Sequence, residues 1–154
     1  MTTELHEKTH YIAITVIIRK ENKYLICKRS EKEQIFPGKW CVPGGKLEQG
    51  DFTHATHDVG TYWLDVLERT ASREVQEETS LTIHNVEYVS NLAFIRPNGY
   101  ATIIISLCGE WSGGEVRLQE EELIDHAWVT LDEAREYDLV ENLWEQMARA
   151  QNRH

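Results

Sequence analysis

The sequence predicts one α+β domain, and two observations lead to this class. Runs rich in β-branched residues both precede and follow one stretch with helical periodicity, at residues 61–79. The chain has 154 residues, the length of one ordinary domain, and contains no repeat, linker or low-complexity tract. We therefore expect a single domain over residues 1–154, with its core at about residues 10–150.

The strands are predicted from apolar and β-branched runs between turn residues. Residues 11–18 and 24–28 are expected to form a hairpin, because a short polar turn joins two such runs. Residues 82–95 are expected to hold one or two strands, and residues 100–107 and 126–129 one strand each.

The central helix is predicted from an apolar stripe, which lies on one narrow face at about 100° per residue. The members of this stripe are Leu64, Leu67, Ala71 and Val75. A second helical stretch begins at Thr130 with Glu133 as its capping-box partner, breaks near Asp138 and resumes to about Ala150. Residues 51–59 have no clear period and are predicted to form a loop.

Composition limits the location and the partners. The formal net charge is −10, with no cluster of Lys and Arg, so a nucleic-acid partner is not expected. No apolar run is long enough to cross a bilayer, and residues 1–10 lack the apolar core of a signal peptide. The 3 cysteines are widely spaced and form no CxxC pair, which favours reduced thiols in the cytoplasm.

Three glutamates gather on the predicted central helix. Glu74, Glu77 and Glu78 share one face at spacings i, i+3 and i+4, and this face lies beside the apolar stripe, at a rim. Their mutual repulsion destabilises a helix unless a cation offsets it, and Mg²⁺ prefers carboxylate oxygens. The sequence therefore indicates a metal site, with a solvated acidic face as the alternative.

A glycine-rich loop lies upstream of that helix. In Pro43-Gly44-Gly45, two adjacent glycines allow positive φ angles and a close approach of the backbone to another group. A backbone carbonyl brought to the glutamates could serve as a further ligand of a hard metal. The alternative is a tight turn after a strand.

Together these two segments resemble the Nudix box, G-x5-E-x7-R-E-U-x-E-E-x-G-U, where U is a large aliphatic residue. The matching residues are Gly45, Asp51 and the run from Arg73 to Leu81. The resemblance covers about residues 36–81 and implies the Nudix fold, a mixed β-sheet sandwiched between helices.

The sequence departs from the Nudix pattern at three points. The gap between Asp51 and Arg73 has 21 residues, which implies an insertion of 14 residues in the box. The first acidic position is Asp51 rather than Glu, with Asp65 as an alternative, and the late glycine is Ser80. An insertion in a loop beside the site costs little stability and can carry specificity for the substrate.

The resemblance implies a Mg²⁺-dependent hydrolase, with Mn²⁺ as a possible substitute, that splits a phosphoanhydride bond in a nucleoside diphosphate derivative. It implies that Arg73 orients a glutamate and that Glu122 is a ligand or the general base, the alternative being an exposed acidic loop. The general base is left open between Glu78 and Glu122. The implied metal ligands are the Gly44 carbonyl, Glu74, Glu77, Glu78 and Glu122.

Other residues are predicted to contact a small-molecule nucleotide, through charge or through flat rings. These are Lys28, Arg29, Phe36, Trp40, Gly45 and Lys46, with Tyr62 and Trp63 as further candidates for the cleft or the inserted loop. The alternative for each Lys or Arg is a role in surface solubility, and the alternative for Trp63 is core packing. His54 and His57 form an HxxH pair, weak as a metal site without a third ligand. A homodimer using Trp111 or Trp144 and a nucleotide sensor without turnover remain alternatives.

Overall fold

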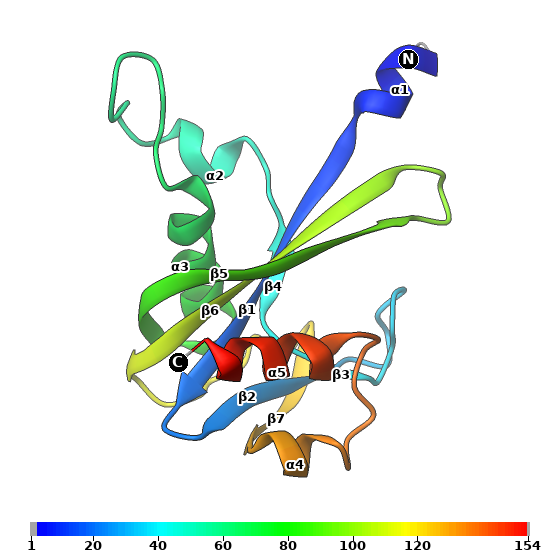
Figure 1. Cartoon of the computed structure of the whole chain (residues 1–154), viewed down its shortest axis with the longest axis vertical. Coiled ribbons are helices and arrows are strands. Elements are labelled where there is room, and N and C mark those ends of the chain that lie inside the picture. The colour runs from blue at the N-terminus through cyan, green and yellow to red at the C-terminus, as the bar shows by residue number, and fades with distance from the viewer. Residues whose placement is uncertain (1–2, 154) are drawn as a thin grey trace.

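The structure is a computed structural model that describes residues 3–153 (Figure 1). The elements, in chain order, are α1 (Thr3–Lys8), β1 (His10–Lys20), β2 (Lys23–Arg29), β3 (Trp40–Cys41), β4 (Gly44–Lys46), α2 (Gly50–Thr53), α3 (Val66–Thr79), β5 (Thr82–Ile95), β6 (Ala101–Gly113), β7 (Leu123–Val129), α4 (Leu131–Ala134) and α5 (Leu143–Asn152).

The strands form one mixed sheet with β1 at its centre. The order is β3-β2-β1-β6-β5, with β4 also paired to β1 and β7 also paired to β2. Strand β1 runs parallel to β6 and antiparallel to β2 and β4. It pairs with β2 only at Arg19 and Lys20, so the two strands diverge beyond the hairpin and leave room for β4.

Strand β1 is buried on both faces, because helices cover both sides of the sheet. Ile14, Val16 and Ile18 pack in the apolar cluster that includes Ala71 and Val75 of α3. Ile17 points the other way, into the cluster that contains Met147 and Ala150 of α5. This alternation explains the unbroken apolar run of the sequence. The predicted sheet between helices is confirmed (Figure 1).

The prediction for the central helix was wrong at its N-terminal end. Helix α3 begins at Val66 rather than near Thr61, because Asp65 adopts a left-handed conformation with φ 52°. Leu64 therefore precedes the helix and is 46% exposed, although Leu67 still packs against the core. Residues 50–53, most of them predicted as loop, form α2.

The segment between α2 and α3 projects from the body and is held by its own contacts (Figure 1). Trp63 packs against Phe52 and His57, with ring centroids 5.3 and 4.5 Å apart, and donates a hydrogen bond to the Ala55 carbonyl. Asp58 accepts two hydrogen bonds from the Arg69 guanidinium. Trp63 therefore anchors this segment ahead of α3, which begins at Val66.

The remaining tryptophans and the cysteines contribute to packing. Trp111 and Trp144 are partly buried against the two apolar clusters, and each donates its indole N–H to a backbone carbonyl. The three cysteines are free and buried. Within residues 3–153, no helix combines the length and the apolar character that a membrane span requires.

Candidate active site

Arg73 of α3 joins several carboxylates from two elements. Its Nη1 donates to both carboxylate oxygens of Glu77 at 2.9 Å, and its Nη2 reaches Glu74 at 3.4 Å. The same Nη2 donates to Asp51 of α2, whose carboxylate also accepts the Glu48 backbone N–H. Arg73 therefore contacts Asp51, and no contact joins it to Asp65 among the described residues.

The three glutamates of α3 have unequal environments. The side chain of Glu77 is 55% exposed and that of Glu74 only 16%, while Glu78 is buried at 6%. Burial raises the pKa of Glu78 to about 8, assisted by the Glu74 and Glu122 carboxylates and opposed by the Gly44 N–H. Burial also raises the pKa of Glu74. A bound cation would relieve this cost of carrying negative charge in a confined space.

The two glycines of β4 permit a close approach of the backbone. A β-carbon on Gly44 would lie 2.1 Å from the Ile14 carbonyl oxygen, and one on Gly45 would lie 3.1 Å from Glu74 Oε1. Neither glycine has a positive φ, so the lack of space for a β-carbon, rather than an unusual backbone angle, explains why glycine is found at both positions. The Gly44 N–H donates to Glu78 Oε2 at 2.8 Å, which joins β4 directly to α3.

Glu122 reaches the site because its loop docks on the end of α3. The backbone N–H groups of Arg117 and Gln119 donate to the carbonyls of Thr79 and Glu78, at 2.9 and 3.0 Å. These carbonyls belong to the last turn of the helix, where carbonyl groups have no hydrogen-bond donor within the helix. The Glu122 carboxylate is thereby placed close enough to raise the pKa of Glu78.

A cleft of about 720 Å³ opens beside these groups. Among the residues predicted as site residues, those that line it are Arg29, Phe36, Gly44, Gly45, Lys46, Glu78 and Glu122. The Arg29 guanidinium, however, donates to the Ile35 carbonyl and pairs with Glu33 at 3.4 Å. Its charge is therefore partly used to hold the loop that follows β2.

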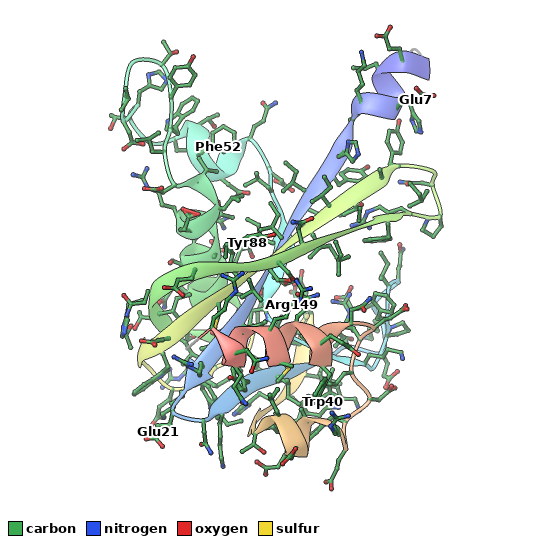
Figure 2. The ribbon with its side chains drawn as sticks, viewed as in Figure 1. Glu7, Glu21, Trp40, Phe52, Tyr88 and Arg149 are labelled. Carbon is green, nitrogen blue, oxygen red and sulfur yellow. The ribbon has the colours of Figure 1, made fainter. Side chains whose placement is uncertain are left out.

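The cleft wall does not include Lys28, Trp40, Tyr62 or Trp63. Tyr62 and Trp63 lie in the inserted segment, which was the other place expected for them, and a contact of Lys28 or Trp40 with substrate stays a prediction. Trp40 packs edge-on against Tyr137, with centroids 4.9 Å apart, because β3 directs it into the core cluster around α5. Lys28 pairs with Trp40 and Asp125 between neighbouring strands. Trp63 packs against Phe52, at the opposite end of the molecule from Trp40 (Figure 2).

Several cleft residues escaped sequence analysis because strand pairing brings them together. Thr15 of β1 lies beside Ser106 of β6, and Phe94 of β5 pairs with Thr102 of β6. Arg96, just after β5, also lines the cleft. Period-2 alternation in β5 and β6 could have placed them on one face, but only the register shows that this face is the floor.

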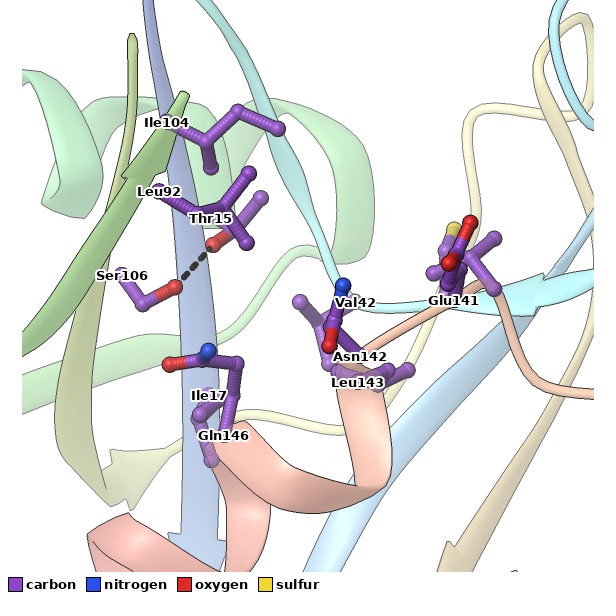
Figure 3. A pocket seen from close by; sticks show the side chains of 12 residues that line it. Thr15, Ile17, Val42, Leu92, Ile104, Ser106, Glu141, Asn142, Leu143 and Gln146 are labelled. Atoms are coloured by element: carbon purple, nitrogen blue, oxygen red, sulfur yellow. Dashed lines mark hydrogen bonds between the residues drawn. The ribbon is translucent and has the colours of Figure 1, made fainter. Parts of the chain in front are cut away.

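A smaller pocket of about 80 Å³ continues from the cleft toward α5 (Figure 3). It shares Thr15 and Ile104 with the cleft, and the Thr15 and Ser106 hydroxyls are 3.1 Å apart within it. Asn142 and Gln146 enter its wall from the N-terminal end of α5. The Gln146 amide oxygen accepts the Ser90 hydroxyl, so Gln146 offers its amide N–H groups to the pocket, whereas Asn142 offers both donor and acceptor beside a mostly apolar surface.

The donor chemistry of the site fits a hard divalent cation. Among the described residues, no three His, Cys, Asp or Glu side chains are grouped as ready ligands. Mg²⁺ does not need such a cage, since it typically keeps several waters and uses one or two carboxylates together with substrate phosphates. Glu74 and Glu78 are two such carboxylates, whereas His57 stacks on Trp63 instead.

The sequence model of the NUDIX domain matches residues 8–56 and 62–150 of this chain. The chain belongs to the Nudix family. The unmatched residues 57–61 fall inside the predicted insertion, whose length of 14 residues stays a prediction. A solved Nudix hydrolase of the MutT type, from Burkholderia pseudomallei, has the same fold: it superposes with a TM-score of 0.72 at 20% identity, over 92% of this chain and 98% of its own.

Two curated Nudix relatives differ in their activity. An NAD-capped RNA hydrolase, NudC of Mannheimia succiniciproducens, is 36% identical over 66 residues, which are 43% of this chain and 24% of the relative. A nucleoside triphosphatase, NudI of Escherichia coli, is 27% identical over 134 residues, covering 80% of this chain and 84% of the relative. This chain thus spans about a quarter of the first relative's length.

Proposed function

We propose that this chain hydrolyses a phosphoanhydride bond in a nucleoside diphosphate derivative, with Mg²⁺ or Mn²⁺. The observation that supports this most directly is the buried Glu78 carboxylate at the cleft wall, beside Glu74 and Glu122. Family membership adds to it, since the relatives named above act on nucleotide phosphates.

The residues that would hold the cation are Glu74, Glu78 and the backbone carbonyl of Gly44. When bound, the cation supplies charge neutralisation at the phosphates and a lower pKa for the attacking water. Glu77 is more exposed and pairs with Arg73, so we place it at the outer edge of this site rather than among the cation ligands.

The chain itself contributes positioning and proton transfer. Arg73 holds Asp51, Glu74 and Glu77 in fixed relation through charge-assisted hydrogen bonds. Glu122 is exposed and lies near Glu78, so it can accept a proton from water and release it to solvent. We therefore favour Glu122 over Glu78 as general base, because Glu78 receives the Gly44 N–H and faces the cation site.

The smaller pocket suits the nucleoside. Its apolar floor and the amides of Asn142 and Gln146 can take a flat base and bond its edge. A panel of substrates should therefore include nucleoside triphosphates, NAD⁺, ADP-ribose and dinucleoside polyphosphates, all of which carry a base and a phosphoanhydride bond.

The test is phosphate or pyrophosphate release from this panel with Mg²⁺, Mn²⁺ or a chelator. Glu78→Gln keeps an oxygen for the Gly44 N–H, so it should fold and yet lose about 10²-fold or more in turnover. Glu122→Gln tests the general base, and Glu145→Gln on the exposed side of α5 is the matched control.

Two results would overturn the proposal. Turnover that survives both Glu78→Gln and Glu122→Gln would show that these carboxylates do not carry the reaction. A wild-type protein that binds nucleotides with Mg²⁺ but cleaves none of the panel would instead be a nucleotide sensor.

A further inference from the structure

Two cations at the cleft wall have no acidic partner in this acidic chain. The sequence has 26 Asp and Glu against 16 Lys and Arg. Six other Lys or Arg side chains form ion pairs, but within residues 3–153 no ion pair involves Lys46 or Arg96. Both side chains line the cleft. Positive charges that no carboxylate neutralises attract anions to such a cleft.

These two cations share one aromatic ring. Lys46 Nζ lies 5.0 Å from the centre of the Tyr11 ring, and Arg96 Cζ lies 5.2 Å from the same centre. A phosphate bound beside the Tyr11 ring would therefore be attracted by both charges.

The Arg96 guanidinium is held in place while its outer nitrogens stay available. Its Nε donates to Thr102 Oγ1 at 2.7 Å, and Thr102 is fully buried. The Phe94 ring also packs against it, with its centre 5.5 Å from Cζ. Neither Nη atom has a hydrogen-bond partner among the described residues. An arginine fixed through Nε presents the planar fork that binds a phosphate with two hydrogen bonds.

Strand register places this pair on the cleft side of the sheet. Lys46 pairs with Ala13 and Gly45 with Ile14, so their side-chain positions point to opposite faces of the sheet. Gly45 faces Glu74 of α3. Lys46 is on the other face with Tyr11, two residues from Ala13. The cations therefore lie along the cleft, across β4 from Glu74.

The small pocket lies in the other direction. Thr15 marks its start on β1, and Tyr11 stands four positions earlier on the same face of the strand. A substrate whose diphosphate sits at Glu78 and Gly44 can thus extend both ways, toward the amides of Asn142 and Gln146 or toward Lys46 and Arg96.

We propose that Tyr11, Lys46, Phe94 and Arg96 form a subsite for a further phosphate of the substrate, one that lies beyond the diphosphate that is cleaved. This inference rests on the proposed function of the cleft, which it deepens by naming the substrate class. That class comprises diphosphate compounds with an additional phosphate, either a third phosphate in the chain or a phosphate monoester on the outer moiety.

Matched probe pairs that differ by one phosphate test the subsite. The pairs are ATP with ADP, NADP⁺ with NAD⁺, and coenzyme A with its dephospho form, and the first pair separates a chain phosphate from a monoester. Dissociation constants are measured by calorimetry without metal, and kcat/KM is measured with Mg²⁺. The variants are Arg96→Met, Arg96→Lys and Lys46→Met.

Arg135→Met is the control, because Arg135 also stacks on an aromatic ring, Trp144, at 3.7 Å but does not line the cleft. The wild type should bind the member with the extra phosphate about tenfold more tightly, or more, in at least one pair. Arg96→Met and Lys46→Met should remove most of this advantage, Arg96→Lys should retain part of it, and Arg135→Met should keep it.

Two outcomes would overturn the subsite. One is the absence of any phosphate advantage in the wild type for all three pairs. The other is an advantage that survives in both Arg96→Met and Lys46→Met, which would leave these cations with a packing role on Tyr11. The binding data separate this from the proposed function: a protein that cleaves nothing can still show the advantage, and an active one can lack it.

Discussion

Ser80 ends α3 in a conformation that suits glycine. Its φ is 66° and its N–H donates to the Gln76 carbonyl, which is a left-handed helix cap. A β-carbon is unfavourable there, so the serine found where the Nudix pattern has glycine retains the same turn at some expense in stability.

Ser80→Gly should therefore stabilise the protein by about 0.5–1 kcal/mol, which raises the melting temperature by roughly 1–4 °C. Ser80→Ala, which keeps the β-carbon and loses the hydroxyl bond to the Arg117 carbonyl, separates the two contributions. A lower melting temperature for Ser80→Gly than for the wild type would show that the hydroxyl matters more than the backbone.

Glu78 should make the metal-free protein less stable as the pH rises. Burial raises the pKa of its carboxyl from 4.5 to about 8, so between these values the folded state holds a proton that the unfolded state has released. The contribution of Glu78 to stability is therefore fully present below about pH 4.5 and is lost progressively as the pH rises toward 8.

Thermal melts from pH 5 to 9 in the presence of a chelator test this. The decline should be flattened in Glu78→Gln and retained in the exposed control Glu145→Gln. Equal pH profiles for the wild type and Glu78→Gln would contradict the assignment.

Spacing alone placed Glu74, Glu77 and Glu78 on one side of a helix, and this arrangement follows directly from 3.6 residues per turn. The unequal burial of the three could not be predicted. It depends on β4, which covers Glu78 through the Gly44 N–H and leaves Glu77 to solvent.

At the scale of elements, the contact between α2 and α3 joins the inserted segment to the site. Asp51 is largely buried, at 13% exposure, where it meets Arg73. Sequence analysis left the first acidic position open between Asp51 and Asp65, because Asp65 stands eight positions before Arg73, the spacing of the Nudix pattern. In the structure Asp65 is the left-handed residue just before α3, and the Arg73 side chain pairs with Asp51 instead.

Asp51→Asn should therefore weaken Mg²⁺ activation about tenfold, because Arg73 would be less firmly oriented toward Glu74. Asp65→Asn should leave the Mg²⁺ dependence unchanged. The measurement is the Mg²⁺ concentration for half-maximal turnover in each variant, and equal shifts for both would argue against a specific role of Asp51.

Across the whole molecule, the mixed sheet between two helical layers was predictable from the resemblance and from the β-branched runs. The cleft was predictable only in part. The Gly44-Gly45 and glutamate segments are close in sequence and carry a recognisable pattern. Thr15 lies on β1, whereas Phe94 and Arg96 lie at the end of β5, and the meeting of these two separated segments depends on strand register, which local periodicity does not encode.

The parallel pairing of β1 with β6 also bears on how the protein folds. Thr15 and Ser106, whose hydroxyls meet under the cleft, are 91 positions apart in the sequence. Closing so long a loop costs conformational entropy before the strand contacts contribute any stabilisation, and parallel contacts of this range slow folding. During synthesis on the ribosome, β1, β2, β4 and α3 all emerge before β6 does, so Gly44, Glu74 and Glu78, which we propose to hold the cation, precede the floor on which a substrate would rest.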